Sequence, residues 1–401
     1  MTREYRVVDA GRPDEVYVAL RAALTDGGSA VVPRSTAERV SPQGVSAEGV
    51  SGERQAWPGH GDRAPQNVAL VIETSGSTGV PKRVALSVDA LLASAAASAG
   101  AMGGQGQWLL ALPAHYVAGA QVLVRSLAAG TEPVYYGDGH FDPLRFAELT
   151  AELDDDQLYT SLVPVQLARV VEAAEAGARG AGTALRRFDG ILVGGQSLDP
   201  RLRERAETLG ARLLTTYGSS ETAGGCVYDG VPIGTTVVRA VDGLLEISGP
   251  TLAEGYVGDD ERTAASFHED GGVRWYRTGD LGDVVDGRVM VRGRSDNVII
   301  SGGEKVLLDS VERIVRGVPA LGEVVVVAAD DDEWGQVPVV VATGSDSIAD
   351  LRDLVVRELG RAAAPARIVT VADLPRLSNG KPDRVSAARL ARVDGSASSE
   401  T

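Results

Sequence analysis

From residue 68 to about residue 218 the chain alternates short apolar runs with amphipathic segments, and this alternation constrains its fold more than any other feature. The runs VALVIETS, QWLLALP, QLYTSLVP, GILVGG and RLLTTYG are typical of buried strands. Helices are predicted between them at residues 88–100, 117–129, 143–153, 164–177 and 200–209. Strands that alternate with helices form mostly parallel sheets whose faces the helices cover. We therefore expect an α/β domain of layered, largely parallel sheets.

The 401 residues are many for one domain. The pattern of predicted elements also changes along the chain, from alternating strands and helices to short strands joined by turns. Residues 35–66, rich in Ser, Gly, Pro and charge, predict a long, mobile surface loop. Short strands surround the Asp-Gly pairs at 242–243 and 286–287, which are hairpin signals. We predict a large N-terminal domain with a β-rich subdomain over residues 1–294, and a small mobile α+β domain over residues 295–401.

Composition excludes several classes of protein. The net charge is −16, from 39 basic and 55 acidic residues, whereas nucleic-acid binding needs a basic surface. No apolar run approaches the roughly 20 residues of a membrane helix. The single cysteine, Cys226, cannot form an internal disulfide, which fits a reducing compartment. We expect a cytoplasmic protein with no nucleic-acid partner and no membrane insertion, and a homo-oligomer remains open.

The strongest motif is the segment TSGSTGVPK, which directly follows a buried strand. Its glycines permit a tight turn whose N–H groups converge on phosphate oxygens, and its hydroxyls and ammonium add donors. The residues that offer these groups are Thr74, Ser75, Gly76, Ser77, Thr78, Gly79 and Lys82. An ordinary Gly/Ser turn is the alternative. Only three lysines occur in the chain, Lys82, Lys305 and Lys381, and all three lie in glycine-rich loops.

Four further loops carry candidate groups. YGSSET holds Glu221, a carboxylate that suits Mg²⁺, although a capped helix start explains it equally well. In YRTGD, Asp280 can accept two ribose hydroxyls, or it is a plain turn residue. GRSDNVIISGGEK lies at the predicted boundary between the two domains, so it can also be a hinge. LSNGKPDR places Lys381 on a loop of the small domain.

These five loops, in this order, resemble the signatures of the acyl-adenylate-forming superfamily of acyl-CoA synthetases and related ligases. The stretches LPAHYVAGAQVLVRSL and ETAGGCVYDGVP are most similar to its o-succinylbenzoate–CoA ligases of menaquinone biosynthesis, in their short actinobacterial form. The resemblance implies that a carboxylate attacks ATP to give an acyl-adenylate and pyrophosphate. A mobile C-terminal domain then rotates, and coenzyme A displaces AMP.

The resemblance also implies roles for individual residues. Lys381 would bridge the acid and the α-phosphate, Thr78 and its loop would hold the other phosphates, and Glu221 would bind Mg²⁺. Asp280 and Arg294 would hold the ribose, and Asp296 would be the hinge. The remaining nucleotide contacts would come from Gly194, Gly195, Gln196, Tyr217, Gly218 and Ser220, and coenzyme A would pass Gly302 and Gly303.

The acid that the resemblance implies, o-succinylbenzoate, has two carboxylates, and only one of them reacts. We predict that Arg125 binds the other carboxylate. A surface ion pair at a helix end is the alternative for Arg125. His115, Tyr116 and Gly218 are the other predicted substrate contacts, and either His115 or Tyr116 lines the pocket. Two rival functions remain: a ligase for another carboxylic acid, and a nucleotide-binding regulator without turnover.

Overall fold

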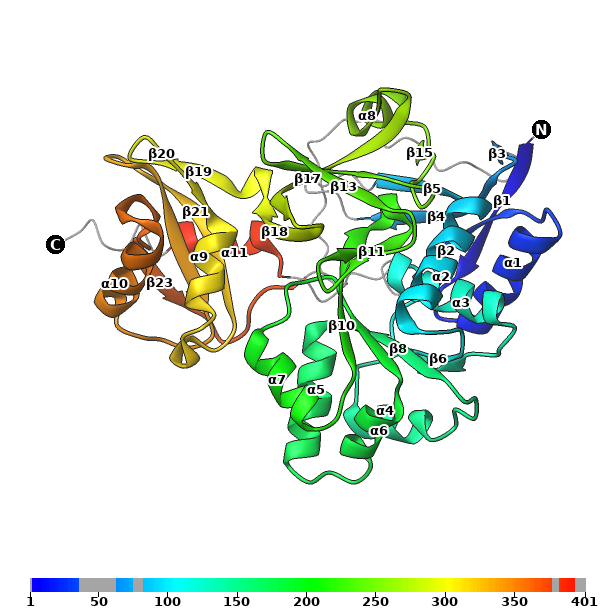
Figure 1. Cartoon of the computed structure of the whole chain (residues 1–401). Helices are drawn as coiled ribbons and strands as arrows, with labels where there is room; N and C mark the ends of the chain where they lie inside the picture. The colour runs from blue at the N-terminus through cyan, green and yellow to red at the C-terminus, as the bar shows by residue number, and fades with distance from the viewer. Residues whose placement is uncertain (1, 36–62, 75–81, 377–381, 394–401) are drawn as a thin grey trace, which may run out of the picture. The chain divides into compact units, whose positions relative to one another are not determined.

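The computed structural model describes residues 2–35, 63–74, 82–376 and 382–393, and it confirms the mixed α/β class (Figure 1). Contacts divide the chain into two compact units. Unit 1 comprises residues 1–238 and 247–276, and unit 2 comprises residues 239–246 and 277–401. The predicted hinge at Asp296 concerns a movement and stays a prediction.

The first sheet of unit 1 has the strand order β15-β5-β4-β2-β1-β3. Its strands are β1 (Thr2–Asp9), β2 (Ala30–Arg34), β3 (Arg63–Pro65), β4 (Val68–Thr74), β5 (Lys82–Ser87) and β15 (Gly255–Tyr256). The strand β2 is parallel to β1 and β4, but β5 runs antiparallel to β4. The expectation of a largely parallel sheet is wrong here, because a short loop can join only antiparallel neighbours.

The strand β3 also shortens the predicted surface loop. Residues 63–65 pair antiparallel with β1, so the segment predicted over residues 35–66 ends in a strand. Residues 36–62 lie outside the described part of the chain.

The second sheet of unit 1 has the order β12-β11-β10-β9-β8-β6-β7 and is parallel from β10 to β7, as expected. Its strands are β6 (Gln107–Leu110), β7 (Val134–Tyr135), β8 (Leu158–Leu162), β9 (Gly190–Val193), β10 (Leu213–Ser219), β11 (Gly224–Tyr228) and β12 (Val231–Pro232). Four helices pack on it through Phe146, Leu167, Leu185 and Ala206. They are α4 (Pro143–Thr150), α5 (Pro164–Glu175), α6 (Ala181–Arg187) and α7 (Pro200–Thr208).

Local signals set most helix limits in unit 1. The first helix is α1 (Pro13–Thr25), and the helices α2 (Val88–Met102) and α3 (Val117–Ala129) begin and end near the predicted residues. The Ser87 hydroxyl accepts a hydrogen bond from the N–H of Ala90 and so caps α2. Gly130 ends α3 with φ +72°, a conformation that favours glycine. The seven-residue α6 was not predicted, because its apolar pattern is too short to stand out.

The β-rich segment follows, with α8 (Asp260–Ser266), β13 (Val237–Val241), β14 (Leu244–Ser248), β16 (Phe267–Asp270), β17 (Val273–Val285) and β18 (Arg288–Arg294). Both predicted hairpin turns are confirmed. Asp242 and Gly243 have φ +52° and +79°, and Asp286 and Gly287 have φ +51° and +74°. Two successive positive φ values are the signature of the turn that the twist of a hairpin favours.

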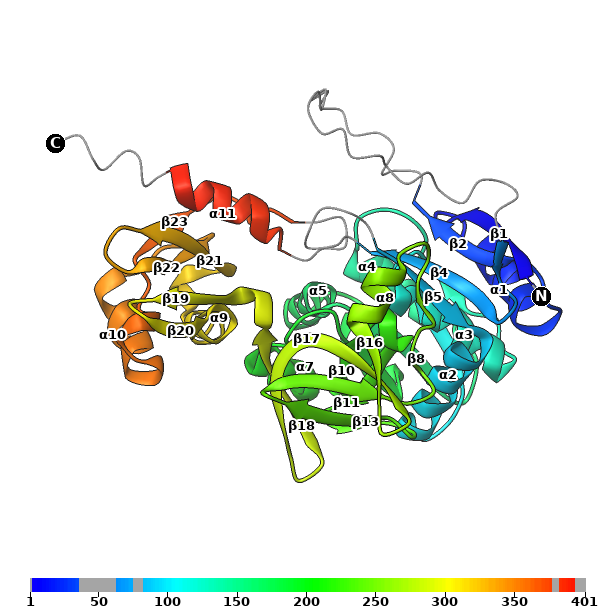
Figure 2. The same ribbon diagram turned by 90° about the horizontal axis from the view of Figure 1, so that it is seen from above.

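Residues 298–393 of unit 2 form a sheet with helices on both faces (Figure 2). Its elements are β19 (Val298–Ser301), β20 (Glu304–Leu307), α9 (Leu308–Val315), β21 (Val324–Asp331), β22 (Gly335–Ala342), α10 (Ile348–Leu359), β23 (Arg367–Thr370) and α11 (Arg384–Val393). Along β21, Val324 and Val326 pack against α9 and α10, whereas Val325 and Val327 pack against α11. This two-residue period buries the strand on both faces. The helix α11 was not predicted.

None of the described helices is both long and apolar enough to cross a membrane.

Candidate functional site

The two ends of the predicted phosphate loop are fixed to the first sheet. Thr74, the last residue of β4, pairs with Lys82, the first residue of β5. Next to them, Glu73 forms ion pairs with Arg34 at 2.8 Å and with Arg83 at 3.6 Å. The charge of Arg83 is therefore paired with a carboxylate of the neighbouring strand. The predicted phosphate ligands between these ends, Ser75, Gly76, Ser77, Thr78 and Gly79, lie outside the described residues.

Lys82, Glu221 and Tyr256 meet although they are far apart in the sequence. The strand β15 pairs with β5, which places the Tyr256 ring 5.7 Å from the Nζ atom of Lys82. The Tyr256 hydroxyl donates a hydrogen bond to Oε1 of Glu221 at 2.8 Å. The N–H of Ala253 also donates to the carbonyl oxygen of Glu221 at 2.8 Å. The predicted metal ligand and the lysine of the phosphate loop are thus held around one tyrosine.

The electrostatics of this cluster favour a fixed carboxylate. Burial raises the pKa of Tyr256, and the negative charge of Glu221 raises it further, so the hydroxyl remains a donor at neutral pH. The Glu221 side chain is buried, and no described residue donates a hydrogen bond to its Oε2 atom. No group of three or more His, Cys, Asp or Glu side chains that could hold a metal occurs among the described residues. A lone carboxylate suits Mg²⁺, which keeps several waters and binds substrate phosphates.

The residues predicted around the adenine lie at the carboxyl ends of neighbouring parallel strands. Gly194, Gly195 and Gln196 follow β9, and Tyr217 and Gly218 lie at the end of β10. A Cβ atom on Gly194 would lie 2.4 Å from Oγ1 of Thr216, and one on Gly218 would lie 2.1 Å from the carbonyl oxygen of Gly224. Both positions therefore require glycine. The strand ends of such sheets are where ligands bind.

The turn that carries Glu221 is a capped helix start. This interpretation of the motif does not exclude the other one, a Mg²⁺ ligand, because the cap uses the neighbours of Glu221. Ser220, Glu221 and Thr222 form one turn of 3-10 helix, and all three are buried. The Ser219 N–H donates to Oγ1 of Thr222 at 2.9 Å. The cap fixes the backbone that presents the carboxylate.

Arg125 is buried, not on the surface. Its side chain is 6% exposed, its guanidinium lies 5.0 Å from the Trp108 ring, and its terminal nitrogen donates to the Tyr228 hydroxyl at 3.5 Å. Because Arg125 is buried and its hydrogen-bond partner among the described residues is the Tyr228 hydroxyl and not a carboxylate, the surface-pair alternative is wrong. Burial lowers the pKa of Arg125. A buried cation without an anion is costly, which favours an anionic ligand.

His115 and Tyr116 precede the same helix, and both are half-buried. Their ring centres lie 4.1 Å apart. The structure therefore brings both rings to the start of α3, and which ring lines the pocket stays open.

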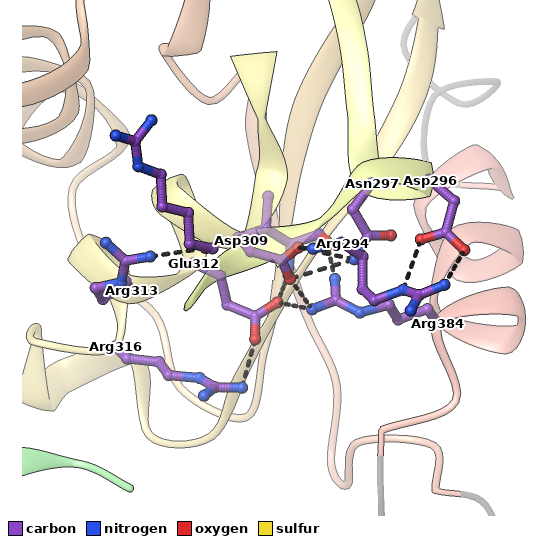
Figure 3. Close-up of polar contacts among 10 residues, drawn as sticks. Arg294, Asp296, Asn297, Asp309, Glu312, Arg313, Arg316 and Arg384 are labelled. Carbon is purple, nitrogen blue, oxygen red and sulfur yellow. Dashed lines mark hydrogen bonds and ion pairs between the residues drawn. The ribbon is translucent and has the colours of Figure 1, made fainter. Parts of the chain in front are cut away.

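In unit 2, the predicted ribose ligands face each other across a hairpin. Asp280 pairs with Arg294 in the ladder of β17 and β18, and their side chains form an ion pair at 3.2 Å. Arg294 also contacts Asp296 at 3.3 Å (Figure 3). The backbone N–H of Arg294 donates to Asp309 at 2.9 Å. The predicted hinge residue is thus linked to the ribose pair by side-chain contacts.

Gly302 and Gly303 form the turn between β19 and β20. They have φ +56° and +85°, and a Cβ atom on Gly302 would lie 2.6 Å from the Trp334 ring. Lys305 lies exposed on the strand β20 and not in the loop that its sequence context suggests. Lys381 lies outside the described residues.

Sequence reasoning did not identify Tyr256, Trp108 or Tyr228 as neighbours of the predicted site. Their sequence signal is weak, because isolated aromatic residues in strands are ordinary core residues. Cys226 is buried, and burial raises the pKa of its thiol to about 12, which does not suit a nucleophile.

Comparisons with known proteins agree with this geometry. The family model for AMP-binding enzymes matches residues 31–257, and the model for the AMP-binding enzyme C-terminal domain matches residues 310–381. A Mycobacterium tuberculosis protein named "Probable 2-succinylbenzoate--CoA ligase" is 39% identical over 342 residues, which cover 82% of this chain and 86% of that protein.

Two solved structures share the fold. The o-succinylbenzoate CoA synthetase (MenE) of Bacillus subtilis, in complex with the acyl-adenylate intermediate OSB-AMP, matches with a TM-score of 0.73 at 23% identity, over 96% of this chain and 88% of that one. The same enzyme in complex with ATP and magnesium ion matches with a TM-score of 0.68 at 23% identity, over 92% of this chain and 81% of that one. At these identities the likeness concerns the fold alone.

Proposed function

The chain belongs to the AMP-binding enzyme family, and we propose that it is the AMP-forming ligase that joins o-succinylbenzoate to coenzyme A in menaquinone biosynthesis. The observation that carries this proposal is the 39% identity to the 2-succinylbenzoate–CoA ligase of M. tuberculosis, which extends over 82% of the chain. The buried Arg125 supports the substrate class, because an acid with a second carboxylate supplies the anion that this guanidinium lacks.

The reaction has two steps. A carboxylate oxygen of the acid attacks the α-phosphorus of ATP, the bond to the β-phosphate oxygen breaks, and pyrophosphate leaves. The sulfur of coenzyme A then attacks the carbonyl carbon of the adenylate, the thiol loses its proton, and AMP leaves. Negative charge gathers on phosphate oxygens in the first step, so fixed cations and N–H donors supply most of the catalysis.

We assign the first step to residues of the loops described above. Lys82 and the segment before it bind the β- and γ-phosphates, and Lys381 binds the α-phosphate and the attacking carboxylate. Glu221, held by Tyr256, is the protein ligand of Mg²⁺, which neutralises phosphate charge when it is bound. Asp280 and Arg294 hold the ribose, and Gly194 and Tyr217 border the adenine.

The reaction consumes ATP and coenzyme A, so the proposal includes a cytoplasmic location. Gly302 and Gly303 would contact coenzyme A, because both glycines lie exposed on their turn and carry no side chain that would keep a ligand away. The partners of the protein in this proposal are small molecules.

A panel of carboxylic acids with ATP, Mg²⁺ and coenzyme A tests the proposal, with AMP formation as the readout. We expect o-succinylbenzoate to be preferred. A preference for a monocarboxylic acid by orders of magnitude would show a ligase for another acid. Failure to release pyrophosphate with every acid would show a nucleotide-binding regulator.

A further inference from the structure

Gln121 is a buried polar side chain that the described residues leave without partners. It is 0% exposed, and neither its amide nitrogen nor its amide oxygen has a hydrogen-bond partner. A buried amide without hydrogen bonds destabilises the folded protein. Its presence therefore calls for a group that pairs with it.

Gln121 lies on the same face of α3 as Arg125. The two residues are four positions apart, which places their side chains side by side one helical turn apart. The Nε atom of Arg125 also has no hydrogen-bond partner. This face thus carries unpaired N–H donors on two buried side chains, one unpaired amide oxygen and one positive charge.

The surroundings connect this face with the predicted reaction centre. A Cβ atom on Gly224 would lie 3.3 Å from Cγ of Gln121, so the glutamine borders the start of β11. Gly224 is only three residues beyond Glu221. The hydroxyl of Ser94 donates to the carbonyl oxygen of Ala223 at 2.9 Å and so holds this segment against α2.

We propose that Gln121 is a specificity-determining residue whose side-chain N–H donates to the same non-reacting carboxylate that Arg125 binds. This inference rests on the proposed function and extends it to a second residue. A carboxylate has two oxygens and one negative charge, which match two donors and one cation. A glutamine adds the second donor without adding a second positive charge, so the buried pair stays neutral when the acid is bound.

The test compares two substrates in the wild type and in Gln121→Leu. One substrate is o-succinylbenzoate, and the other is its analogue without the non-reacting carboxylate. We expect kcat/KM for o-succinylbenzoate to fall about 10- to 100-fold, the range for losing a hydrogen bond to a charged group. The value for the analogue should change less than about twofold. Equal losses for both substrates, or no loss for either, overturn the inference.

Stability gives a second readout that a structural role would not produce. Because the amide is unpaired in the free protein, Gln121→Leu and the unbranched Gln121→Met should unfold at the same urea concentration as the wild type or at a higher one. A marked loss of stability in both variants shows a structural glutamine and overturns the inference.

Gln166 on α5 provides the matched control. Its amide is fully engaged, because Nε2 donates to the carbonyl oxygen of Ala111 at 2.9 Å and Oε1 accepts from the N–H of Val163 at 3.1 Å. Gln166→Leu should lower the free energy of unfolding without changing the ratio of the kcat/KM values for the two substrates.

If the wild type prefers a monocarboxylic acid, the proposed function itself fails. If the wild type prefers o-succinylbenzoate and Gln121→Leu keeps that preference, only the inference about Gln121 fails.

Discussion

The hydroxyl of Tyr256 donates a hydrogen bond to Oε1 of Glu221 at 2.8 Å, and the two residues are 35 positions apart. This contact leaves Oε2 without a donor among the described residues, while the ring of the same tyrosine lies beside Lys82. Mutation of a residue that orients a metal ligand commonly lowers metal affinity by about 10- to 100-fold. Tyr256 is therefore a positioning residue in our proposal.

Tyr256→Phe removes only this hydroxyl. We expect the concentration of Mg²⁺ needed for half-maximal AMP formation to rise about tenfold, which is within the range for losing a hydrogen bond that orients a metal ligand. Binding of Mn²⁺ in the presence of a non-hydrolysable ATP analogue, followed by electron paramagnetic resonance, should weaken in parallel. Tyr17→Phe is the matched control, because it removes a hydroxyl that donates to the carbonyl oxygen of Thr131 at 3.0 Å, away from the site. The tyrosine has no role in metal binding if both variants show the same metal dependence.

Arg125→Lys keeps the positive charge but loses the planar guanidinium and its contact with Trp108. We expect KM for the acid to rise about tenfold or more, and KM for ATP to stay within about twofold, because only the acid contacts this side chain in the proposal. Steady-state kinetics with each substrate varied separately measures both. A similar rise for ATP would indicate damage to the fold.

Lys381→Ala should slow formation of the adenylate by about 10² or more, the scale of one lost electrostatic contact in a transition state. Pyrophosphate release in single turnovers measures this step. The second step, started from synthetic acyl-adenylate and coenzyme A, should be much less affected because the lysine acts on the α-phosphate and the attacking acid. Equal effects on both steps would contradict the role assigned to Lys381.

Glu312 should stabilise unit 2 far more than an exposed acid does. Its side chain is 6% exposed, and it accepts hydrogen bonds from the N–H of Val326 at 3.0 Å, from Arg384 at 2.7 Å and from Arg316 (Figure 3). Glu312→Gln should lower the free energy of unfolding by about 2 kcal/mol, less than for fully buried pairs because the arginines reach solvent.

Glu323 is the control for this prediction, because its side chain is 50% exposed and pairs with Arg376 at 2.5 Å. Glu323→Gln should lower the free energy of unfolding by less than about 1 kcal/mol. Hydrogen exchange of the Val326 amide reports on the variants directly. Equal protection of that amide in both variants would mean that Glu312 adds nothing beyond a surface pair.

Cys226 should resist alkylation in the folded protein. Burial raises the pKa of its thiol to about 12, so the reactive thiolate is scarce at pH 8 and the side chain is inaccessible. Because the folded pKa lies above the unfolded value, the contribution of this thiol to stability is complete below about pH 8.5 and is lost as the pH rises towards 12. Iodoacetamide labelling with and without urea measures the protection. Rapid labelling without urea would show that Cys226 is exposed.

Several elements could be predicted because their signals are local. The Ser87 cap, the glycine that ends α3 and the Asp-Gly turns depend on residues within a few positions of each other. The parallel strands β6 to β10 followed from their alternation with helices. The class of enzyme followed from the resemblance of five short loops to the signatures of the acyl-adenylate-forming superfamily, and such a resemblance can be recognised because each loop keeps its chemistry within a short segment.

The sequence alone therefore determined the α/β class, most helix limits and the loops that hold the nucleotide in our proposal. Only the tertiary structure decided that β5 returns antiparallel to β4, that Tyr256 reaches Glu221, and that Gln121 and Arg125 are buried together without an anion. The physical reason is that these contacts depend on strand order and on helix packing. The free energy of the whole core selects that order, and no short stretch of residues encodes it.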